Sequence, residues 1–299
     1  MSKKYSVLQA PCSITNGRLT VKKIKQIDFE QRLVPKEELP LLGKRILYTT
    51  PRNYAGALGK LLLERGARIV WMPTVEIWPM SDYRELDQAI DNLSTYDWVG
   101  FTSENGIEAF LNRFFAKGLD QKAIKKTKLA AFKSDAKALE KHGIKADLLP
   151  DEQSPKGIID ELKQRGVKGG RILVPVPEVV GVKEPYVVPE FIEQLKGMGM
   201  IVYRVAAYTT TAVTKGIEIE MRMLCNGEID IVILTSSAEI FSLLKRLNGN
   251  KEVLNKATIA YMGKFTAKTG KEVGLNLDIV PEKYTMRDLV EAMEVYFRK

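Results

Sequence analysis

The sequence holds little of the side-chain chemistry on which most enzymes rely. One histidine, His142, and two cysteines, Cys12 and Cys225, stand among its 299 residues. Ser-His-Asp hydrolysis and histidine-ligated metal chemistry need histidines that the chain lacks, and His142 follows an expected helix end, where its cationic form suits the helix dipole. The cysteines form neither a metal-ligand spacing nor a disulfide framework, so we expect free thiols and no metal site. Acid–base chemistry is left to Tyr, Lys, Asp and Glu.

Membrane-spanning, secretory and nucleotide-binding patterns are also missing from the sequence. No stretch approaches the roughly 20 apolar residues that span a bilayer, and the first residues lack the apolar core of a secretory signal. We therefore expect a cytoplasmic protein without a membrane partner. No G-x-G-x-x-G motif follows an expected strand and the phosphate-loop pattern is absent, so we expect no nucleotide cofactor.

Positive charge is in excess. Lys and Arg number 46 against 37 Asp and Glu, a formal net charge of +9. Such an excess is typical of a nucleic-acid surface or of a pocket for a small polyanion. The basic residues are dispersed and no nucleic-acid module is recognisable. The sequence therefore favours an anion pocket on a solvated basic surface, with no nucleic acid as partner.

Short apolar runs alternate with longer amphipathic segments from Gly43 onward, which predicts an α/β fold. Runs that are apolar on both faces indicate central parallel strands covered by helices on each side. Each run ends at small or polar residues, where a helix is expected to begin. The clearest runs are WVGFTS at 98–103, RILVPV at 171–176, DIVILTS at 230–236 and TIAYMG at 258–263.

An internal repeat organises the chain. Residues 97–110, DWVGFTSENGIEAF, align with residues 230–243, DIVILTSSAEIFSL. Further along, Asp147 aligns with Asp278, and the upstream segments match as well. The sequence from residue 43 to the end therefore predicts two similar α/β units in tandem, with a cleft where the carboxyl ends of their strands face each other.

Small hydroxyl side chains follow the paired strands of this repeat. At expected helix N-termini, free backbone N–H groups and the helix dipole attract a carboxylate or phosphate. The alternative is that these residues only cap their helices. Their matched occurrence in both units favours substrate binding, and the residues concerned are Thr102, Ser103, Thr235, Ser236 and Ser237.

Two further segments supply candidates. In YMGKFTAKTG, Gly263, Lys264 and Thr266 follow a strand and open a helix, so that the backbone can approach a ligand closely. Tyr208, in VAAYTTTA, ends a strand and can present its hydroxyl to the cleft; the alternative is an aromatic ring that packs while its hydroxyl stays hydrated.

Several of these motifs together resemble the uroporphyrinogen-III synthase (HemD) family. They are GKRILYTTPRN, GARIVWMPTVEI, YDWVGFTSENGIEAF, VYRVAAYTTT, IDIVILTSSAEI, TIAYMGKFTAKTGKEVG and VPEKYTMRDLVEAM, in family order from about Gly43 to the end. The resemblance implies two similar HemD-like lobes with parallel sheets flanked by helices. A two-stranded connector joins them, with a cleft between the lobes.

The resemblance also implies how the chain divides. The first lobe is discontinuous and comprises residues 43–74 and 213–299, and the second comprises 90–206. The connector comprises 75–89 and 207–212, and residues 1–42 form a lead segment in which RLTVKKIKQIDFE suggests a strand pair.

The family's activity is then the expected function. The resemblance implies closure of hydroxymethylbilane to uroporphyrinogen III by a lyase, on the way to heme, siroheme and cobalamin, without cofactor or metal. Tyr208 matches the family's tyrosine and is the candidate to protonate the departing hydroxyl. The hydroxyl turns, Gly263, Lys264, Thr266 and Arg52 are the implied substrate-binding residues. The alternative is a catalytically impaired relative that binds tetrapyrroles or regulates.

Two segments depart from the family pattern. Phe132-Lys133-Ser134-Asp135 stands where the first copy of a Gly-x-x-Thr turn is expected, which removes a glycine and adds a negative charge. Pro175-Val176-Pro177 replaces a Pro-Arg-Gly sequence and predicts a long loop to Pro189. PLLGKRIL resembles the junction after a uroporphyrinogen methyltransferase in fused proteins, so a separate methyltransferase is an expected partner. Hydroxymethylbilane synthase is another expected partner, and the chain is expected to be a monomer.

Overall fold

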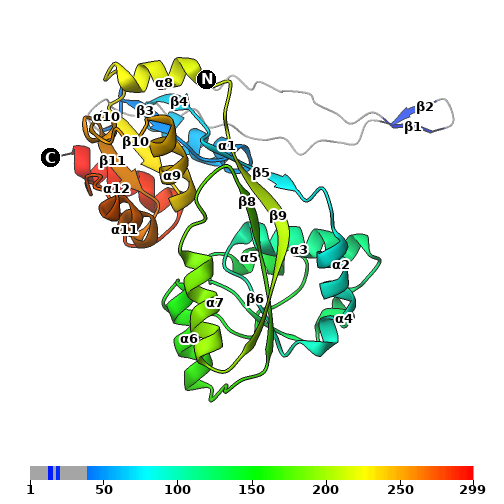
Figure 1. The fold of residues 1–299 in the computed structure, drawn as a ribbon. Helices are drawn as coiled ribbons and strands as arrows, with labels where there is room; N and C mark the ends of the chain where they lie inside the picture. The colour runs from blue at the N-terminus through cyan, green and yellow to red at the C-terminus, as the bar shows by residue number, and fades with distance from the viewer. Residues whose placement is uncertain (1–12, 16–17, 21–38, 299) are drawn as a thin grey trace. The chain divides into compact units, whose positions relative to one another are not determined.

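The structure, a computed structural model, describes residues 13–15, 18–20 and 39–298 (Figure 1). Contacts divide the chain into a first unit, residues 1–39, and a second, residues 40–299. In the first unit, β1 (Ser13–Thr15) pairs antiparallel with β2 (Arg18–Thr20). The rest of the strand pair expected in RLTVKKIKQIDFE lies outside the described residues.

The second unit begins a little earlier than the expected end of the lead segment at residue 42. Leu41 is fully buried and packs in a core with Ile46, Leu58 and Leu62. Because an apolar side chain in the core ties its backbone to the fold, the compact unit starts at Pro40.

The first lobe is built on a parallel four-stranded sheet in the order β11-β10-β3-β4. All four residues of β10 are buried, and they alternate between two cores: Val232 and Leu234 face one, Ile231 and Ile233 the other. This pattern is the one expected of a parallel strand covered on both faces. The elements of this lobe are β3 (Arg45–Tyr48), α1 (Arg52–Leu63), β4 (Arg68–Trp71), α8 (Glu218–Cys225), β10 (Ile231–Leu234), α9 (Ser237–Arg246), α10 (Glu252–Asn255), β11 (Thr258–Tyr261), α11 (Lys264–Glu272) and α12 (Met286–Phe297).

The second lobe contains a five-stranded sheet in the order β5-β9-β8-β6-β7. Only β5 is antiparallel to its neighbour. Two apolar cores again cover the two faces of the sheet. The elements are β5 (Val75–Pro79), α2 (Arg84–Asp91), η2 (Leu93–Thr95), β6 (Trp98–Gly100), α3 (Glu104–Ala116), α4 (Gln121–Ile124), β7 (Lys128–Ala130), α5 (Ala136–Glu140), α6 (Pro155–Gln164), β8 (Arg171–Val180), α7 (Val187–Gly197) and β9 (Ile201–Ala212).

The tandem repeat extends to individual hydrogen bonds. In each lobe, the aspartate just before a central strand, β6 or β10, accepts a hydrogen bond from the first N–H of the strand on one side, β8 or β3. A second aspartate, later in the chain, accepts a hydrogen bond from an N–H of the strand on the other side, β7 or β11. Aspartates that align in the sequence make equivalent bonds, which confirms the prediction of two similar units. The four bonds join Asp97 to Arg171 N (2.7 Å), Asp230 to Arg45 N (2.7 Å), Asp147 to Leu129 N (2.8 Å) and Asp278 to Ile259 N (2.8 Å).

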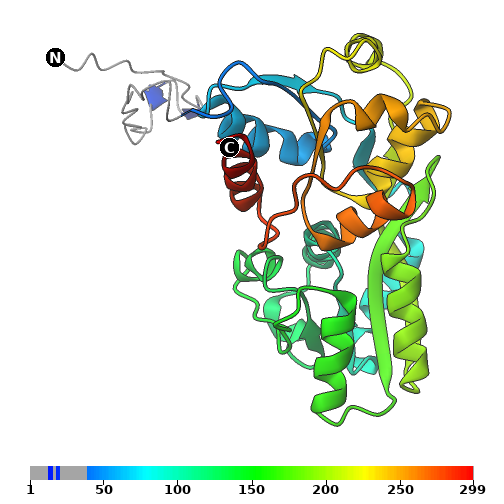
Figure 2. The same cartoon turned by 90° about the vertical axis from the view of Figure 1, so that its left-hand side faces the viewer.

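The lobes are joined by β5 and β9, which pair antiparallel from Val75 opposite Ala212 to Pro79 opposite Tyr208. Figures 1 and 2 show β8 and β9 running together from the second lobe toward the first. The connector strand β5 ends at Pro79, and residues 84–89, expected in the connector, belong to α2.

The prediction of a long loop from Pro175 to Pro189 is wrong for the first half of that segment. Residues up to Val180 continue β8, and Pro177–Val180 pair with β9 as a third strand of the connector. The short strand β6 pairs with β8 only as far as Leu173, so beyond it one edge of β8 is open. An open edge tolerates prolines because they lack an N–H to pair. The register shift between Val176 and Pro177 accommodates the ring of Pro177.

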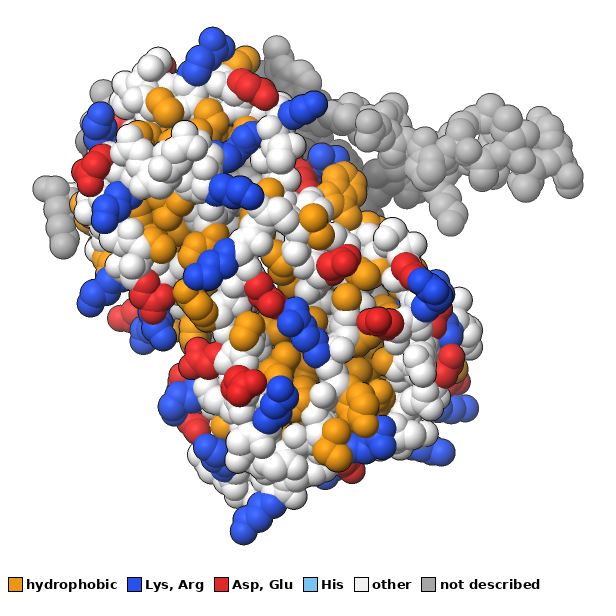
Figure 3. All heavy atoms as spheres, viewed as in Figure 1, with side chains coloured by type: hydrophobic (Ala, Val, Ile, Leu, Met, Phe, Trp, Pro, Cys, Tyr) orange, Lys and Arg blue, Asp and Glu red, His pale blue; other side chains and the backbone are white. Residues whose placement is uncertain are grey.

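Among the described residues, no helix is long and apolar enough to cross a membrane. On the face drawn in Figure 3, Lys and Arg are scattered among Asp and Glu over the described residues and form no single basic patch.

Candidate functional site

A cavity of about 480 Å³ lies between the lobes, within the size range of ~300–1,000 Å³ that is typical of small-molecule sites. Its walls come from the segments that follow β3, β6, β10 and β11, from the connector and from the start of α7. Strand ends from both lobes therefore meet at one place. Seven residues predicted from the sequence line it: Thr102, Ser103, Tyr208, Thr235, Ser236, Ser237 and Thr266.

Three other predicted residues lie outside these walls. Gly263 is needed for packing, because a Cβ there would stand 2.6 Å from the ring of Tyr284. Lys264 is exposed at the start of α11. Arg52 is exposed, with its guanidinium 3.4 Å from Glu76 and 5.7 Å from the ring of Trp78.

Tyr208 lies on β9 where the connector enters the second lobe. Its side chain is 7 % exposed, and its hydroxyl shares a hydrogen bond of 3.2 Å with Oγ of Ser103. Burial raises the pKa of Tyr208 to about 12, and the nearby Asp135 carboxylate adds to the shift. The hydroxyl is thus a hydrogen-bond donor that stays protonated at neutral pH.

Ser103 caps α3 as predicted, accepting from the N–H of Gly106 at 3.1 Å. The same oxygen reaches Tyr208, so one side chain both ends the helix and positions the tyrosine.

Replacing Ser103 with alanine should cost about 1 kcal/mol of stability, as the loss of an N-cap usually does. Ser154→Ala is the matched control, since Ser154 caps α6 at 3.0 Å and does not line the cavity. Urea unfolding should show similar losses for both variants, whereas only Ser103→Ala should lower substrate turnover. Equal kinetics for the two variants would contradict a role for Ser103 beyond capping.

The matching turn of the first lobe is filled by the chain itself. Glu239, 1 % exposed, accepts from the N–H of Thr235 at 2.9 Å and from the hydroxyls of Thr49 (2.5 Å), Thr235 (2.5 Å) and Ser236 (3.0 Å). Ser236 in turn accepts from the N–H of Glu239 at 3.3 Å and caps α9. An internal carboxylate therefore takes the N–H of Thr235 and the hydroxyls of this turn, whose residues still line the cavity.

Glu239 was missed by the sequence reasoning, although a signal was present. Serine at the N-cap with glutamate three residues later is the capping-box pattern, in which the glutamate turns back to the helix start. Burial raises the pKa of Glu239, and the four hydrogen bonds oppose that shift. Ser237 is likewise engaged, since its hydroxyl bonds that of Thr269 at 2.8 Å.

Two cavity residues link the lobes directly. The hydroxyl of Tyr54, on α1, donates to Oδ1 of Asn105, on α3, at 2.9 Å, and Asn53 donates to the same oxygen at 3.1 Å. Burial raises the pKa of Tyr54. Asn105 lies within the motif at 96–110 and Tyr54 directly follows GKRILYTTPRN, but no pattern in the sequence indicates that these two side chains meet.

Thr50 contributes a further polar group to the wall. It is 1 % exposed, and its hydroxyl has no hydrogen-bond partner among the described residues. The adjacent helix α1 starts at Arg52 without a side-chain cap and without an acidic residue in its first turn. Buried hydroxyls are normally paired, so this one is suited to a ligand.

The charge of the cavity differs from the expectation of a basic anion pocket. Among the described residues that line it are Glu104, Asp135, Glu184 and Glu239, and no Lys or Arg. Asp135 belongs to the segment that departs from the family pattern. Burial raises the pKa of Asp135 to about 6, against the opposing hydrogen bond from Ser134.

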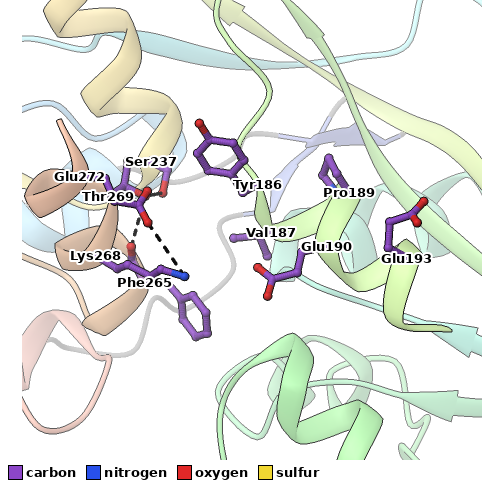
Figure 4. Close-up of a pocket in the computed structure, with 10 residues that line it drawn as sticks. All are labelled: Tyr186, Val187, Pro189, Glu190, Glu193, Ser237, Phe265, Lys268, Thr269 and Glu272. Atoms are coloured by element: carbon purple, nitrogen blue, oxygen red, sulfur yellow. Dashed lines mark hydrogen bonds and ion pairs between the residues drawn. The ribbon is translucent and has the colours of Figure 1, made fainter. Parts of the chain in front are cut away.

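A second recess of about 450 Å³ adjoins the cavity and shares Val187, Ser237 and Phe265 with it. Figure 4 shows that residues from the start of α7 face residues of α11 across this recess, with Lys268 paired to Glu272. No group of three or more His, Cys, Asp or Glu that could hold a metal ion occurs among the described residues.

The fold and site define a two-lobed α/β class of protein. Its features are two similar α/β lobes, a connector of long strands and an interlobe cavity beside a buried tyrosine. Residues 56–291 match the family described as uroporphyrinogen-III synthase HemD. The chain belongs to this family, which contains enzymes of porphyrin biosynthesis.

Individual relatives agree with this assignment. The uroporphyrinogen-III synthase of Synechococcus elongatus is 27% identical over 267 residues, which are 88% of this chain and 98% of that protein. The porphyrin biosynthesis protein HemD of Ruminiclostridium josui is 26% identical over 256 residues; they cover 85% of this chain but 49% of that protein, so the chain spans about half its length. A crystal structure of a mutant uroporphyrinogen III synthase from Thermus thermophilus has a TM-score of 0.66 at 19% identity and covers 86% of this chain and 99% of that one. The last comparison establishes the two-lobed fold.

Proposed function

We propose that this chain is a uroporphyrinogen-III synthase, a lyase that closes hydroxymethylbilane into uroporphyrinogen III. One observation carries the proposal: a single interlobe cavity brings Tyr208 together with the hydroxyl turns of both lobes. Family membership supplies the reaction.

In the proposed reaction, the hydroxymethyl group on the first ring of the linear tetrapyrrole leaves as water, and the resulting cation is attacked by the substituted carbon of the last ring. The spiro intermediate then fragments and recloses with that ring inverted. Tyr208 donates a hydrogen bond to the departing oxygen, and Ser103 holds the tyrosine in position. The cavity walls keep water from the cation, and no step draws on a metal or cofactor.

Binding of the substrate's carboxylates is assigned to neutral donors, because the cavity lining carries no Lys or Arg among the described residues. The N–H groups at the start of α1 and the hydroxyl of Thr50 are the strongest donors of this kind. Arg52 and Lys264, both exposed, add positive charge outside the walls.

Thr50→Val tests this assignment because it should raise the stability of the free protein and weaken substrate binding. Valine removes a buried hydroxyl without a partner, so the free protein should gain up to about 1 kcal/mol of stability. The same change should raise KM about fivefold, since a hydrogen bond of ~1 kcal/mol to the substrate is lost. Differential scanning calorimetry and steady-state kinetics measure the two effects.

Thr127→Val is the control, because the buried hydroxyl of Thr127 donates to the carbonyl of Leu93 at 3.0 Å. That variant should lose stability and keep its KM. An unchanged KM in Thr50→Val would remove Thr50 from the binding site.

The function itself is tested by a coupled assay. Hydroxymethylbilane is supplied to the purified protein, and the type I and type III isomers are resolved by chromatography. Mainly type III product supports the proposal. Spontaneous type I product alone would favour the second candidate, an impaired relative that binds tetrapyrroles; the acidic cavity lining is the observation that motivates it.

The proposal includes the expected division of the chain, with residues 43–74 and 213–299 as one lobe and 90–206 as the other. Residues 75–89, which include the start of α2, and 207–212 lie between them, and residues 1–42 form a lead segment whose Leu41 packs on the first lobe. It also includes a cytoplasmic monomer supplied by hydroxymethylbilane synthase and acting beside a uroporphyrinogen methyltransferase. These assignments follow the family resemblance.

A further inference from the structure

Asp135 is the one carboxyl group of the cavity that is partly buried and has no cationic partner among the described residues. It follows β7, immediately before α5, and lines the wall near Tyr54 and Tyr208, close enough that its charge raises the pKa of both tyrosines. Its carboxylate accepts a hydrogen bond from the hydroxyl of the neighbouring Ser134 at 2.9 Å.

The other three acids of the wall are already neutralised or bonded within the protein. Glu239 accepts the four hydrogen bonds described above. Glu184 pairs with Arg204, and Glu104 lies 3.4 Å from Nζ of Lys141. Asp135 is thus the cavity carboxyl best able to exchange a proton with a bound molecule.

We propose that Asp135 is the catalytic acid that protonates the departing hydroxyl of the substrate, while Tyr208 holds the leaving oxygen by a hydrogen bond. The inference rests on the proposed function and deepens it.

The proton and electrons balance over one turnover. The carboxyl group of Asp135 gives its proton to the hydroxyl oxygen as the C–O bond breaks, and that oxygen leaves as water with the bonding electron pair. The pyrrole nitrogen donates its lone pair to stabilise the cation. After the spiro intermediate has reclosed, the ring carbon that formed the last bond loses a proton to the Asp135 carboxylate, which restores the acid.

The surroundings of Asp135 favour its protonated form. Burial is the largest cause of its raised pKa of about 6, and the Glu104 carboxylate on α3 adds to it. Lys133, two residues earlier, is held by Asp151 and leaves Asp135 without a counter-charge. A substrate rich in carboxylates adds further negative charge on binding and raises the pKa again. Asp135 is a far stronger acid than Tyr208, whose pKa lies at about 12.

The test compares wild type, Asp135→Asn, Asp135→Glu and Asp91→Asn by their formation of the type III isomer between about pH 5 and 8.5. For wild type, kcat/KM should fall as pH rises through the pKa of Asp135, because the protonated form is required. In Asp135→Asn, the fall of kcat/KM at high pH should disappear, and kcat should be about 100-fold lower than in wild type. Asp135→Glu should restore both in part. Asp91→Asn, which changes an exposed carboxylate on α2 outside the cavity, should match wild type.

Stability measurements separate a folding defect from the loss of the acid. The folded-state pKa of Asp135 lies above its unfolded value, so its contribution to stability is fully present below the unfolded pKa and is lost as pH rises through about 6. Asp135→Asn should therefore unfold at a higher urea concentration than wild type at pH 8, and this difference should disappear at pH 4.

Two results would overturn the inference while the proposed function stands: an unchanged pH profile in Asp135→Asn, or a lower KM with full kcat, which would make Asp135 only a repulsive charge. Failure of wild type to form type III product would instead overturn the proposed function.

Discussion

Tyr208→Phe should lower kcat about 100-fold and leave the fold nearly intact. The phenol oxygen is the hydrogen-bond donor assigned to the leaving hydroxyl, and phenylalanine keeps the ring in the core without it. The cost in stability should be close to one hydrogen bond, about 1 kcal/mol, because only the bond to Ser103 is lost. Isomer-resolved kinetics and urea unfolding measure the two quantities.

Tyr261→Phe is the matched control for this variant. Tyr261 is fully buried in the first lobe, and its hydroxyl donates to the carbonyl of Asn276 at 2.7 Å, outside the cavity. It should lose at least as much stability as Tyr208→Phe and keep wild-type kinetics. Unchanged turnover in Tyr208→Phe would remove that tyrosine from its role.

Glu239→Ala should destabilise the protein by about 3 kcal/mol, the largest loss of stability that we expect from a single change in the site. Alanine leaves a small void and takes the acceptor from the buried Thr49 hydroxyl and the Thr235 N–H. Glu239→Gln keeps the shape and one acceptor oxygen, and its amide can donate to the Thr235 and Ser236 hydroxyls. It should therefore cost less than about 1 kcal/mol.

The comparison should depend on pH in a definite direction. Burial raises the folded-state pKa of Glu239 above its unfolded value, so stability is full below the unfolded pKa and is lost as pH rises through the folded one. The gap between wild type and Glu239→Gln should shrink as pH rises above the unfolded pKa of the glutamate. Urea unfolding followed by circular dichroism measures it, with the exposed Glu291→Ala as control. Equal losses for alanine and glutamine would refute the hydrogen-bond account.

Much of the site could be predicted because it lies at strand ends. Apolar runs such as 230–236 are recognisable as strands, and the parallel order brings their carboxyl ends to one edge. The hydroxyl turns and Tyr208 follow directly from that reasoning, and they do line one cavity. Gly263 shows the limit of reasoning from turns. A glycine at a turn predicts space for a ligand, whereas the ring of Tyr284 occupies the space beside Gly263.

The sequence by itself determined the α/β class, the tandem repeat and the strand-end turns, because these depend on local periodicity and on residues close together in the chain. Only the tertiary structure decided that Glu239 closes one turn, that Pro177 lies in a strand, and that Thr50 and Asp135 face the same cavity. Those outcomes depend on which side chains from distant segments meet and on how much water reaches them. Neither property is encoded in the spacing of residues along the chain.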